Sequence, residues 1–460
     1  MHDLSDVWLY WHYVYYELLL FSLLGFLIGG IDEVFVDTIW ITRTIWRRFW
    51  VFSKIARVSV ATLAPPVTPG EIAVFIAAWD ESDVINAMLT NLLAQFGNEK
   101  FHVFLGCYPN DPKTIEAAIA IRSPRITIVV NPTAGPTTKA DCLNSVWQAL
   151  EFHETSRRMK FKSILLHDAE DVVHRCEPRL FDKLIERFDL VQIPVLPLPD
   201  EGSRWIAGHY CDEFAESHGK SLVVREAIGA AVPSAGVGCA ISRSAIQAIA
   251  NSRGGSPFDD DSLTEDYELG LRIKQTGGRT ILVRIRDHPN GQLVAIRAHF
   301  PASLDASVRQ KTRWIIGISL AGWDRLGWHR NPFENWMRFR DRRAPFAAVI
   351  LCVGYIVLVM TTINIAFSIM TGMTFPALPE FIEILLAVNL AMLVWRMIVR
   401  VGFVTYEYDW KEGLRSVPRI IIGNIIAIIA ARRAMFQYAK ISTFKDLKWD
   451  KTQHKFPDQI

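Results

Sequence analysis

Residues 262–278, SLTEDYELGLRIKQTGG, carry the pattern around which the rest of the chain is organised. Glu265 and Asp266 open a helical pattern whose apolar residues recur at the spacing of one buried face, until two glycines stop it. Because a helix N-terminus favours negative charge, the pattern predicts that Asp266 stays ionised and acts as a base near neutral pH. Acidic residues in a first helical turn are usually caps, so this interpretation depends on what lies on either side.

Composition indicates a soluble domain joined to membrane segments. The 460 residues are 50% hydrophobic yet 21% charged, a combination that neither a small soluble enzyme nor a pure membrane bundle would have. The formal net charge of +2 argues against a general nucleic-acid binder, so we expect no nucleic-acid partner. The six cysteines include no CxxC pair and indicate reduced, cytosolic thiols in packed positions.

Three apolar segments, at 7–31, 344–370 and 381–399, are long enough to cross a bilayer. Basic residues follow the first segment, precede the second and follow the third. The N-terminal tail, in contrast, is acidic. The positive-inside rule therefore places the N-terminus outside and the intervening domain in the cytosol. A fourth apolar run, 420–431, is too short to span and is basic at both ends, which predicts an interfacial helix on the inner leaflet.

Between the membrane segments, strand and helix patterns alternate. Apolar strand patterns are followed by helical patterns, the first of which we expect Ser82 to cap. The expected strands are 72–77, 101–105, 126–130, 163–166 and 280–285, and the expected helices include 114–121, 141–152 and an amphipathic one at 303–323. This alternation predicts an α/β domain with a mixed, mostly parallel sheet that binds ligands at the carboxyl ends of its strands. No dinucleotide fingerprint and no P-loop motif follows any of these strands.

The strand pattern 163–166 leads into a run of acids, HDAED, at 167–171. Carboxylates spaced two residues apart in a turn, such as Asp168 and Glu170, can point their oxygens at one hard cation. Magnesium or manganese would suit such a site and would bridge to diphosphate oxygens. For a single triplet, however, solvated loop acids are the ordinary explanation.

A second pattern, QxxRW, falls on the predicted helix 303–323. Gln310 and Arg313 share one face of that helix, and Trp314 adjoins it. The amide and the guanidinium can bind a leaving diphosphate, and the indole face can stack on a sugar. Taken singly, Trp314 is better explained as a core or membrane-interface residue.

The order of these motifs resembles the processive family-2 glycosyltransferases, which include cellulose, chitin and hyaluronan synthases. The shared features are AAWDE at a strand end, HDAED, TED and QxxRW, flanked by membrane segments and covering roughly 71–323. The phrases YPNDP at 108–112 and PTTKADCLN at 136–144 are more similar to the glycosyltransferase domain of the bacterial phage-adsorption protein B (NfrB) group. The resemblance implies a nucleotide-sugar-binding domain of the GT-A type.

The resemblance also implies roles on the donor side of the site. Asp80 and Glu81 match the nucleotide-facing acids after the first strand, and Lys139 and Asp141 match positions that hold the nucleotide diphosphate and the sugar. Three acids match or adjoin the metal-binding DxD motif: Asp168, Glu170 and Asp171. Because Glu170 replaces the second Asp of that motif, Asp171 is an alternative ligand.

On the acceptor side, Asp266 matches the general base, with Glu265 beside it. Gln310 and Arg313 match the diphosphate clamp, and Trp314 matches the ring on which the acceptor stacks. Residues 233–239 stand where the family places its acceptor loop, but they lack the family's pair of aromatic residues.

The resemblance implies a metal-dependent, inverting transfer of a sugar from a UDP-sugar to a growing polysaccharide, for exopolysaccharide synthesis at the bacterial inner membrane. The sugar would be a hexose or an N-acetylhexosamine such as N-acetylmannosamine. Three spans make a poor pore alone, so we expect export to need a dimer, another subunit or an outer-membrane partner. Two alternatives are a single-step transferase acting on a membrane lipid and a non-catalytic membrane subunit or phage-adsorption factor.

These expectations divide the chain into four parts. Residues 1–64 are a transmembrane helix and a basic linker, and 65–323 are the cytosolic glycosyltransferase domain. Residues 324–343 are a basic interfacial connector. Residues 344–460 contain two transmembrane helices, the interfacial helix and a short basic tail.

Overall fold

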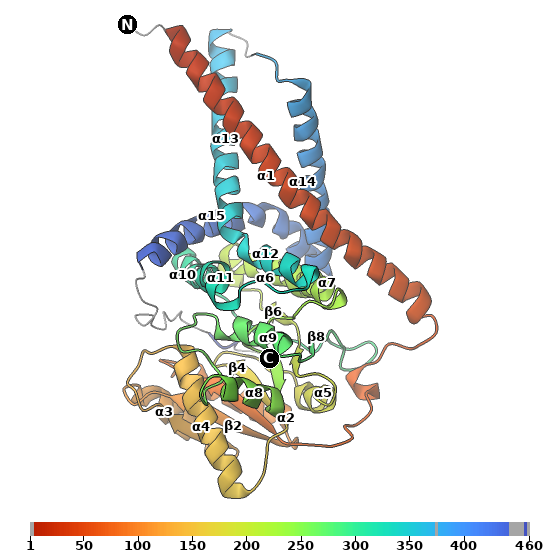
Figure 1. Cartoon of the computed structure of the whole chain (residues 1–460), viewed down its shortest axis with the longest axis vertical. Coiled ribbons are helices and arrows are strands. Elements are labelled where there is room, and N and C mark those ends of the chain that lie inside the picture. The colour runs from red at the N-terminus through yellow and green to blue at the C-terminus, as the bar shows by residue number, and fades with distance from the viewer. Residues whose placement is uncertain (1–3, 373–375, 441–454, 458–460) are drawn as a thin grey trace.

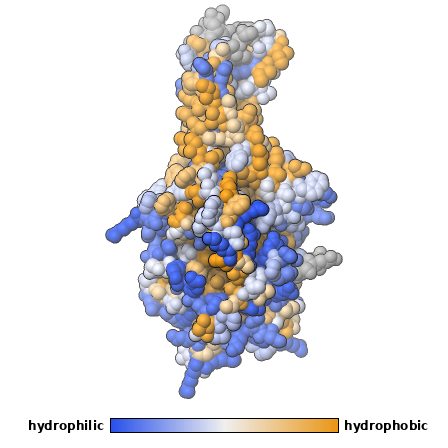
Figure 2. Space-filling model, turned by 90° about the vertical axis from the view of Figure 1, so that its right-hand side faces the viewer, coloured by the Kyte–Doolittle hydropathy of each residue, from blue (hydrophilic) through white to orange (hydrophobic). Residues whose placement is uncertain are grey.

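The computed structural model describes residues 4–372, 376–440 and 455–457. Figure 1 shows two regions along the long axis of the molecule, an α/β body at one end and long helices that project from it at the other. Figure 2 shows apolar side chains gathered over the projecting helices, whereas the surface of the body is mostly hydrophilic. This is the division that the composition predicts for a soluble domain joined to membrane segments.

A seven-stranded mixed sheet forms the centre of the body, in the order β3-β2-β1-β4-β7-β5-β8. Its strands are β1 (Ile72–Ala77), β2 (Phe101–Cys107), β3 (Ile126–Val130), β4 (Ser163–Asp168), β5 (Leu190–Gln192), β7 (Cys239–Ser242) and β8 (Thr280–Leu282). Every neighbouring pair is parallel except the two that involve β7. The prediction of a mixed, mostly parallel sheet is therefore confirmed. A separate parallel pair joins β6 (Val195–Pro197) to β9 (Ile296–Ala298).

Alternate side chains of β1 pack into two different apolar clusters, one on each face of the sheet. One cluster lies against α2 (Ile85–Phe96) and α5 (Glu177–Leu184). The other lies against α4 (Lys139–Arg157) and α8 (Arg243–Ser252). Because both faces are covered, the central strands read as unbroken apolar runs in the sequence, which is why they were predictable.

Several predicted boundaries are wrong. Strand β4 continues past 166 to Asp168, and β8 ends at Leu282 rather than at 285. Ser82 does not cap α2, because Val84 stands at the N-cap and makes no side-chain cap bond. The helix expected at 114–121 is α3 (Pro112–Ile119), which Asp111 caps by accepting the backbone N–H of Thr114.

The amphipathic helix expected at 303–323 is divided into three pieces. Ser303 caps α10 (Leu304–Trp314), a π-helical segment follows at Ile315–Ala321, and α11 (Gly322–Leu326) completes it. Gly317 in the π-helical piece lies so close to Thr264 that a β-carbon there would collide with the threonine side chain. The altered helix thus allows close packing against the start of α9 (Glu265–Gln275).

In the part of the chain that the structure describes, four helices are long and apolar enough to cross a membrane: α1 (Leu4–Trp46), α13 (Ala344–Thr371), α14 (Glu380–Glu407) and α15 (Trp410–Lys440). Helix α1 continues well past the predicted end at residue 31. Its acids are paired there: Glu33 with Arg340 at 2.9 Å, and Asp37 with Lys220 at 2.7 Å. These ion pairs join the helix to the body.

The apolar run at 420–431 belongs to α15, which has 31 residues, so the prediction that this helix is too short to span is wrong. In Figure 1, α15 lies across the inner ends of α13 and α14 instead of running alongside them. Ile426 and Ala430 pack with Val308 of α10 and with Ala348 of α13. This crosswise course is compatible with an interfacial helix, and the interfacial placement remains a prediction.

Candidate active site

A cavity of about 520 Å³ opens at the carboxyl ends of β1 and β4, beneath the long helices. Its volume lies in the range of about 300–1,000 Å³ that is typical of ligand pockets. Most of the predicted site residues line it: Glu81, Lys139, Asp168, Glu170, Asp171, Glu265, Asp266, Gln310, Arg313 and Trp314. Motifs that are far apart in the sequence thus meet in one space.

Asp80 and Asp141 do not line this cavity. Asp80 is exposed, has a positive φ of 54°, and donates its backbone N–H to Asp111 Oδ2 at 2.6 Å. Asp141 stands in the first turn of α4, where its Oδ2 accepts a hydrogen bond from Asn131 Nδ2 at 2.9 Å. The neighbouring Glu81 is buried and faces the cavity.

The acidic turn after β4 divides its carboxylates between two tasks. Asp168 forms an ion pair with Lys139, and Glu170 faces the cavity beside it. Asp171 is turned to the protein, because its Oδ2 accepts the backbone N–H of Asp168 at 3.0 Å and lies 3.0 Å from His167 Nδ1. Asp171 therefore holds the turn in shape.

His167 is buried between two carboxylates. Its Nε2 lies 3.1 Å from Glu177, opposite the contact with Asp171. Burial by itself lowers the pKa of His167, but the charge of Glu177 and the hydrogen bonds to both acids outweigh it and raise the pKa to about 9. The charged imidazole of His167 thus holds the end of β4 in place through its contacts with Asp171 and Glu177.

The donor set at this turn suits a hard divalent cation. Asp168 and Glu170 provide carboxylate oxygens at one side of the cavity, as magnesium and manganese require. Within the described ranges, no three His, Cys, Asp or Glu side chains are grouped closely enough to hold a metal alone. A cation here would therefore need further oxygens from a ligand such as a diphosphate.

Asp266 lies in the first turn of α9, and its Oδ1 accepts the N–H of Tyr267 at 2.7 Å. Burial raises the pKa of Asp266, and it raises the pKa of Glu265 to about 8, with Lys139 opposing the shift in both. The ammonium of Lys139 and the backbone N–H groups at the start of α9 lower the pKa of Asp266, so the helix N-terminus does favour the carboxylate, but desolvation outweighs both effects.

The loop at 233–239 packs directly on α9. Gly236 has a φ of +77°, and a β-carbon there would collide with the carboxylate of Asp266. Gly270 of α9 meets the same loop, since a β-carbon there would lie 2.6 Å from the backbone nitrogen of Ser234. Pro233 and Ala235 line the cavity.

The QxxRW helix, α10, closes the cavity on the side of the long helices. The ring of Trp314 lies 6.2 Å from that of Tyr210 and 6.4 Å from that of Phe214, both on α6 (Ile206–Glu216). The cavity is also lined by polar residues that belong to no motif and that the sequence analysis missed: Glu213, Arg225, Tyr267, His299 and Asp341. Only their convergence in space identifies them.

The fold and the site together define a glycosyltransferase with membrane-spanning helices. The model of "Glycosyl transferase family group 2" matches residues 163–399, which is more than half of the chain. The chain belongs to this family, which confirms the resemblance to family-2 glycosyltransferases.

Two curated relatives are similar over almost the whole chain. It is 35% identical over 479 aligned residues to Bacteriophage adsorption protein B of Escherichia coli (strain K12) and to Bacteriophage N4 adsorption protein B of Escherichia coli O157:H7. Each alignment covers 99% of this chain and 64% of the relative. The chain therefore spans somewhat less than two thirds of the length of these relatives.

A solved glycosyltransferase has a similar fold. The mannosyltransferase of Pyrobaculum calidifontis, in complex with GDP-Man and Mn²⁺, has a TM-score of 0.53 at 14% identity. The alignment covers 91% of this chain and 99% of that one. At this level of identity, the likeness shows the fold alone.

Proposed function

We propose that this protein is a metal-dependent, inverting glycosyltransferase that transfers a hexose or an N-acetylhexosamine from a UDP-sugar to a growing polysaccharide. The observation that carries the proposal is the convergence of Asp168, Asp266 and Arg313 in one cavity, from three elements distant in the sequence. Each motif alone is weak evidence for an activity, but the meeting of all three in one cavity supports a role in one reaction.

In this proposal, Lys139, Gln310 and Arg313 bind the diphosphate of the donor and neutralise the charge that develops as it leaves. Asp266 accepts the proton of the acceptor hydroxyl, and that oxygen attacks the anomeric carbon from the face opposite the diphosphate. One glycosidic bond forms as the bond to the nucleoside diphosphate breaks. Trp314 stacks on the acceptor.

Asp168 and Glu170 would hold the cation, and Asp171 would support them through His167 and the backbone of Asp168. When bound, a divalent cation supplies positive charge against the departing diphosphate. We do not assign ligand-binding roles to Asp80 and Asp141, because neither lines the cavity. Glu265, whose pKa is raised, would lie protonated beside the base at neutral pH.

The proposed setting is the bacterial inner membrane, with the N-terminus outside and residues 65–323 in the cytosol. The long apolar helices support an association with the lipid bilayer. Residues 324–343 would connect the domain to the membrane helices, and an outer-membrane partner would receive the exported polysaccharide.

A second candidate rests on the names of the relatives, which describe phage adsorption. The chain would then be a membrane subunit or phage-adsorption factor that retains the fold without turnover. A third candidate, transfer of a single sugar to a membrane lipid, uses the same cavity and differs only in its product.

The test uses purified protein in nanodiscs with magnesium or manganese and a panel of UDP-sugars, with GDP-mannose as a further donor. Release of UDP, or of GDP from GDP-mannose, is followed together with product size, and EDTA should abolish release. Release with one donor and a product that grows to high mass supports the polysaccharide synthase. A lipid carrying one sugar supports the single-step transferase. No release from any donor, with UDP binding intact, supports the non-catalytic candidate.

A further inference from the structure

The cavity extends past Asp266 into a second polar region that the proposed roles leave unused. Three side chains from three elements line it there: Arg225 of α7 (Leu222–Ala227), Tyr267 of α9 and Asp341 of α12 (Pro332–Arg342). Tyr267 directly follows the proposed base in the sequence, so this region adjoins the reaction centre.

The three side chains form one bonded group centred on Asp341. Arg225 Nη1 donates to Asp341 Oδ1 at 2.9 Å and to Oδ2 at 2.7 Å. The hydroxyl of Tyr267 donates to the same Oδ2 at 2.6 Å. The side chain of Arg225 is only 3% exposed, whereas that of Asp341 is 20% exposed.

This group retains capacity for further hydrogen bonds. A carboxylate has about four acceptor positions, and Asp341 uses three of them on Arg225 and Tyr267. Arg225 Nε donates to the carbonyl of Ala231, but its Nη2 has no hydrogen-bond partner among the described residues. That nitrogen is itself buried, so the acceptor position left on the 20% exposed carboxylate of Asp341 is the one open to a ligand hydroxyl.

The charges indicate the class of ligand. Because Arg225 and Asp341 neutralise each other, the group has no net charge with which to attract a free anion or cation. It offers a carboxylate acceptor, a guanidinium donor and the edge of an aromatic ring. Hydroxyl groups that both donate and accept, on a neutral sugar ring, match this set.

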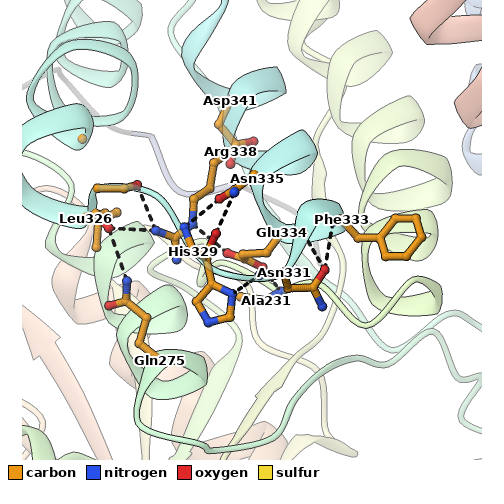
Figure 3. A network of polar contacts seen from close by, with 12 residues as sticks. Ala231, Gln275, Leu326, His329, Asn331, Phe333, Glu334, Asn335, Arg338 and Asp341 are labelled. Atoms are coloured by element: carbon orange, nitrogen blue, oxygen red, sulfur yellow. Dashed lines mark hydrogen bonds and ion pairs between the residues drawn. The ribbon is translucent and has the colours of Figure 1, made fainter.

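The helix that carries Asp341, α12, is held in place by a network of polar contacts, which Figure 3 shows. Arg338, one turn before Asp341 on α12, donates to the carbonyls of Leu326 at 2.7 Å and Gly327 at 3.0 Å. Glu334 accepts from Arg338 at 2.9 Å and from the backbone N–H of Ala231 at 2.7 Å. These bonds fix α12 against Ala231, whose carbonyl accepts a hydrogen bond from Arg225. Asp341 is therefore held in position before a ligand binds.

We propose that Arg225, Tyr267 and Asp341 form a subsite for a neutral sugar residue of the acceptor, with the reacting hydroxyl next to Asp266. The inference rests on the proposed function and deepens it. Helix α13 begins three residues after Asp341, so the subsite lies between the reaction centre and the first residues of a candidate membrane span.

The test measures binding by titration calorimetry, with the full-length chain in nanodiscs saturated with UDP. The probes are chitotetraose and cellotetraose, which are neutral, and a hyaluronan tetrasaccharide, which is anionic. We expect a neutral probe to bind best. Because hydrogen bonds to a charged group are involved, Asp341→Asn should raise the Kd for the neutral probe at least about tenfold. The Kd for UDP should be unchanged.

Asp324→Asn is the matched control. Asp324 of α11 likewise accepts a tyrosine hydroxyl, from Tyr438 at 3.0 Å, but does not line the cavity. Its Kd for the probe should equal that of the unsubstituted protein. Since Asp341→Asn also leaves buried Arg225 without its charge partner, Tyr267→Phe is a gentler second test, and it should raise the Kd several-fold with a smaller fall in Tm than Asp341→Asn.

Two results would overturn the subsite while leaving the proposed function standing. One is UDP binding without binding of either neutral tetrasaccharide. The other is equal affinity for the neutral probe in Asp341→Asn, Tyr267→Phe and Asp324→Asn. Preferential binding of the anionic probe would overturn the assignment to a neutral sugar. A chain that binds no UDP contradicts the proposed function itself and the subsite with it.

Discussion

Lys139 is the residue on which the charge balance of the site depends. Its ammonium pairs with Asp168, and the charges of Asp168, Glu265 and Asp266 raise its pKa against the opposing effect of burial. One cation thus faces three carboxyl groups in a partly enclosed cavity. The remaining negative charge suits a divalent metal, and it adds to burial in raising the pKa values of Glu265 and Asp266.

Replacement of the proposed base gives the most direct prediction at this scale. Asp266→Asn should lower kcat for sugar transfer by about 10²–10⁴-fold, because the acceptor proton loses its base, while UDP binding is retained. Stopped assays of UDP release and calorimetry with UDP measure the two effects. Asp261→Asn, at an exposed position in the preceding loop, should leave both unchanged. Normal turnover by Asp266→Asn would refute the assignment.

The pH dependence follows from the raised pKa of Asp266. A raised pKa means that Asp266 is protonated at a higher pH than a solvated aspartate, so transfer is lost as the pH falls through that value. The acid limb of kcat/KM should therefore lie above the normal aspartate range. Since Lys139 lowers this pKa, Lys139→Met should move the limb to higher pH, whereas Lys160→Met, at an exposed position, should not. An unmoved limb would show that another group titrates.

At the scale of elements, α15 is fastened to the α/β body by a buried ion pair. Arg419 is 1% exposed and contacts Asp212 of α6 at 2.8 Å and Glu412 at 2.8 Å. This ion pair joins α15, which lies across the long helices, to α6, whose Tyr210 contacts Trp314. The position of α15 therefore affects the wall of the cavity.

Arg419→Ala should destabilise the protein by about 3–5 kcal/mol, because it leaves buried Asp212 without its ion-pair partner and removes one of the two partners of Glu412. Arg415→Ala, on the same helix, removes an exposed partner of Glu412 and should cost about 1 kcal/mol or less. Thermal unfolding in detergent gives the comparison, and the first variant should show much the larger fall in Tm. Equal falls in Tm would mean that the buried pair does not fasten α15.

For the molecule as a whole, the orientation in the membrane can be tested with exposed cysteines introduced one at a time. In a Cys352→Ser background, Ala377→Cys, in the exposed link between α13 and α14, should react with an impermeant maleimide on intact cells. Glu99→Cys, on the surface of the α/β body, should react only after lysis. The basic flanks of the spans give this direction. Labelling of Glu99→Cys on intact cells would reverse the proposed orientation.

Comparison with the whole structure shows which features could be predicted from the sequence. Unbroken apolar strands, the helical period after Asp266 and the long apolar segments follow from local physics, since burial on both faces or within lipid selects such patterns. The order of HDAED, TED and QxxRW pointed to the family, and the family and fold are confirmed. These features were predictable because each is encoded within a short stretch.

Other features were decided only by the tertiary structure. The turning of Asp171 onto His167, the exclusion of Asp80 and Asp141 from the cavity, and the crosswise course of α15 have no local signal. Asp341 meets Arg225 across 116 residues, so no periodicity links them. Local sequence determines which elements form and what chemistry they carry. Which side chains share a cavity depends on the packing of distant elements, because burial and pairing are properties of the assembled surfaces.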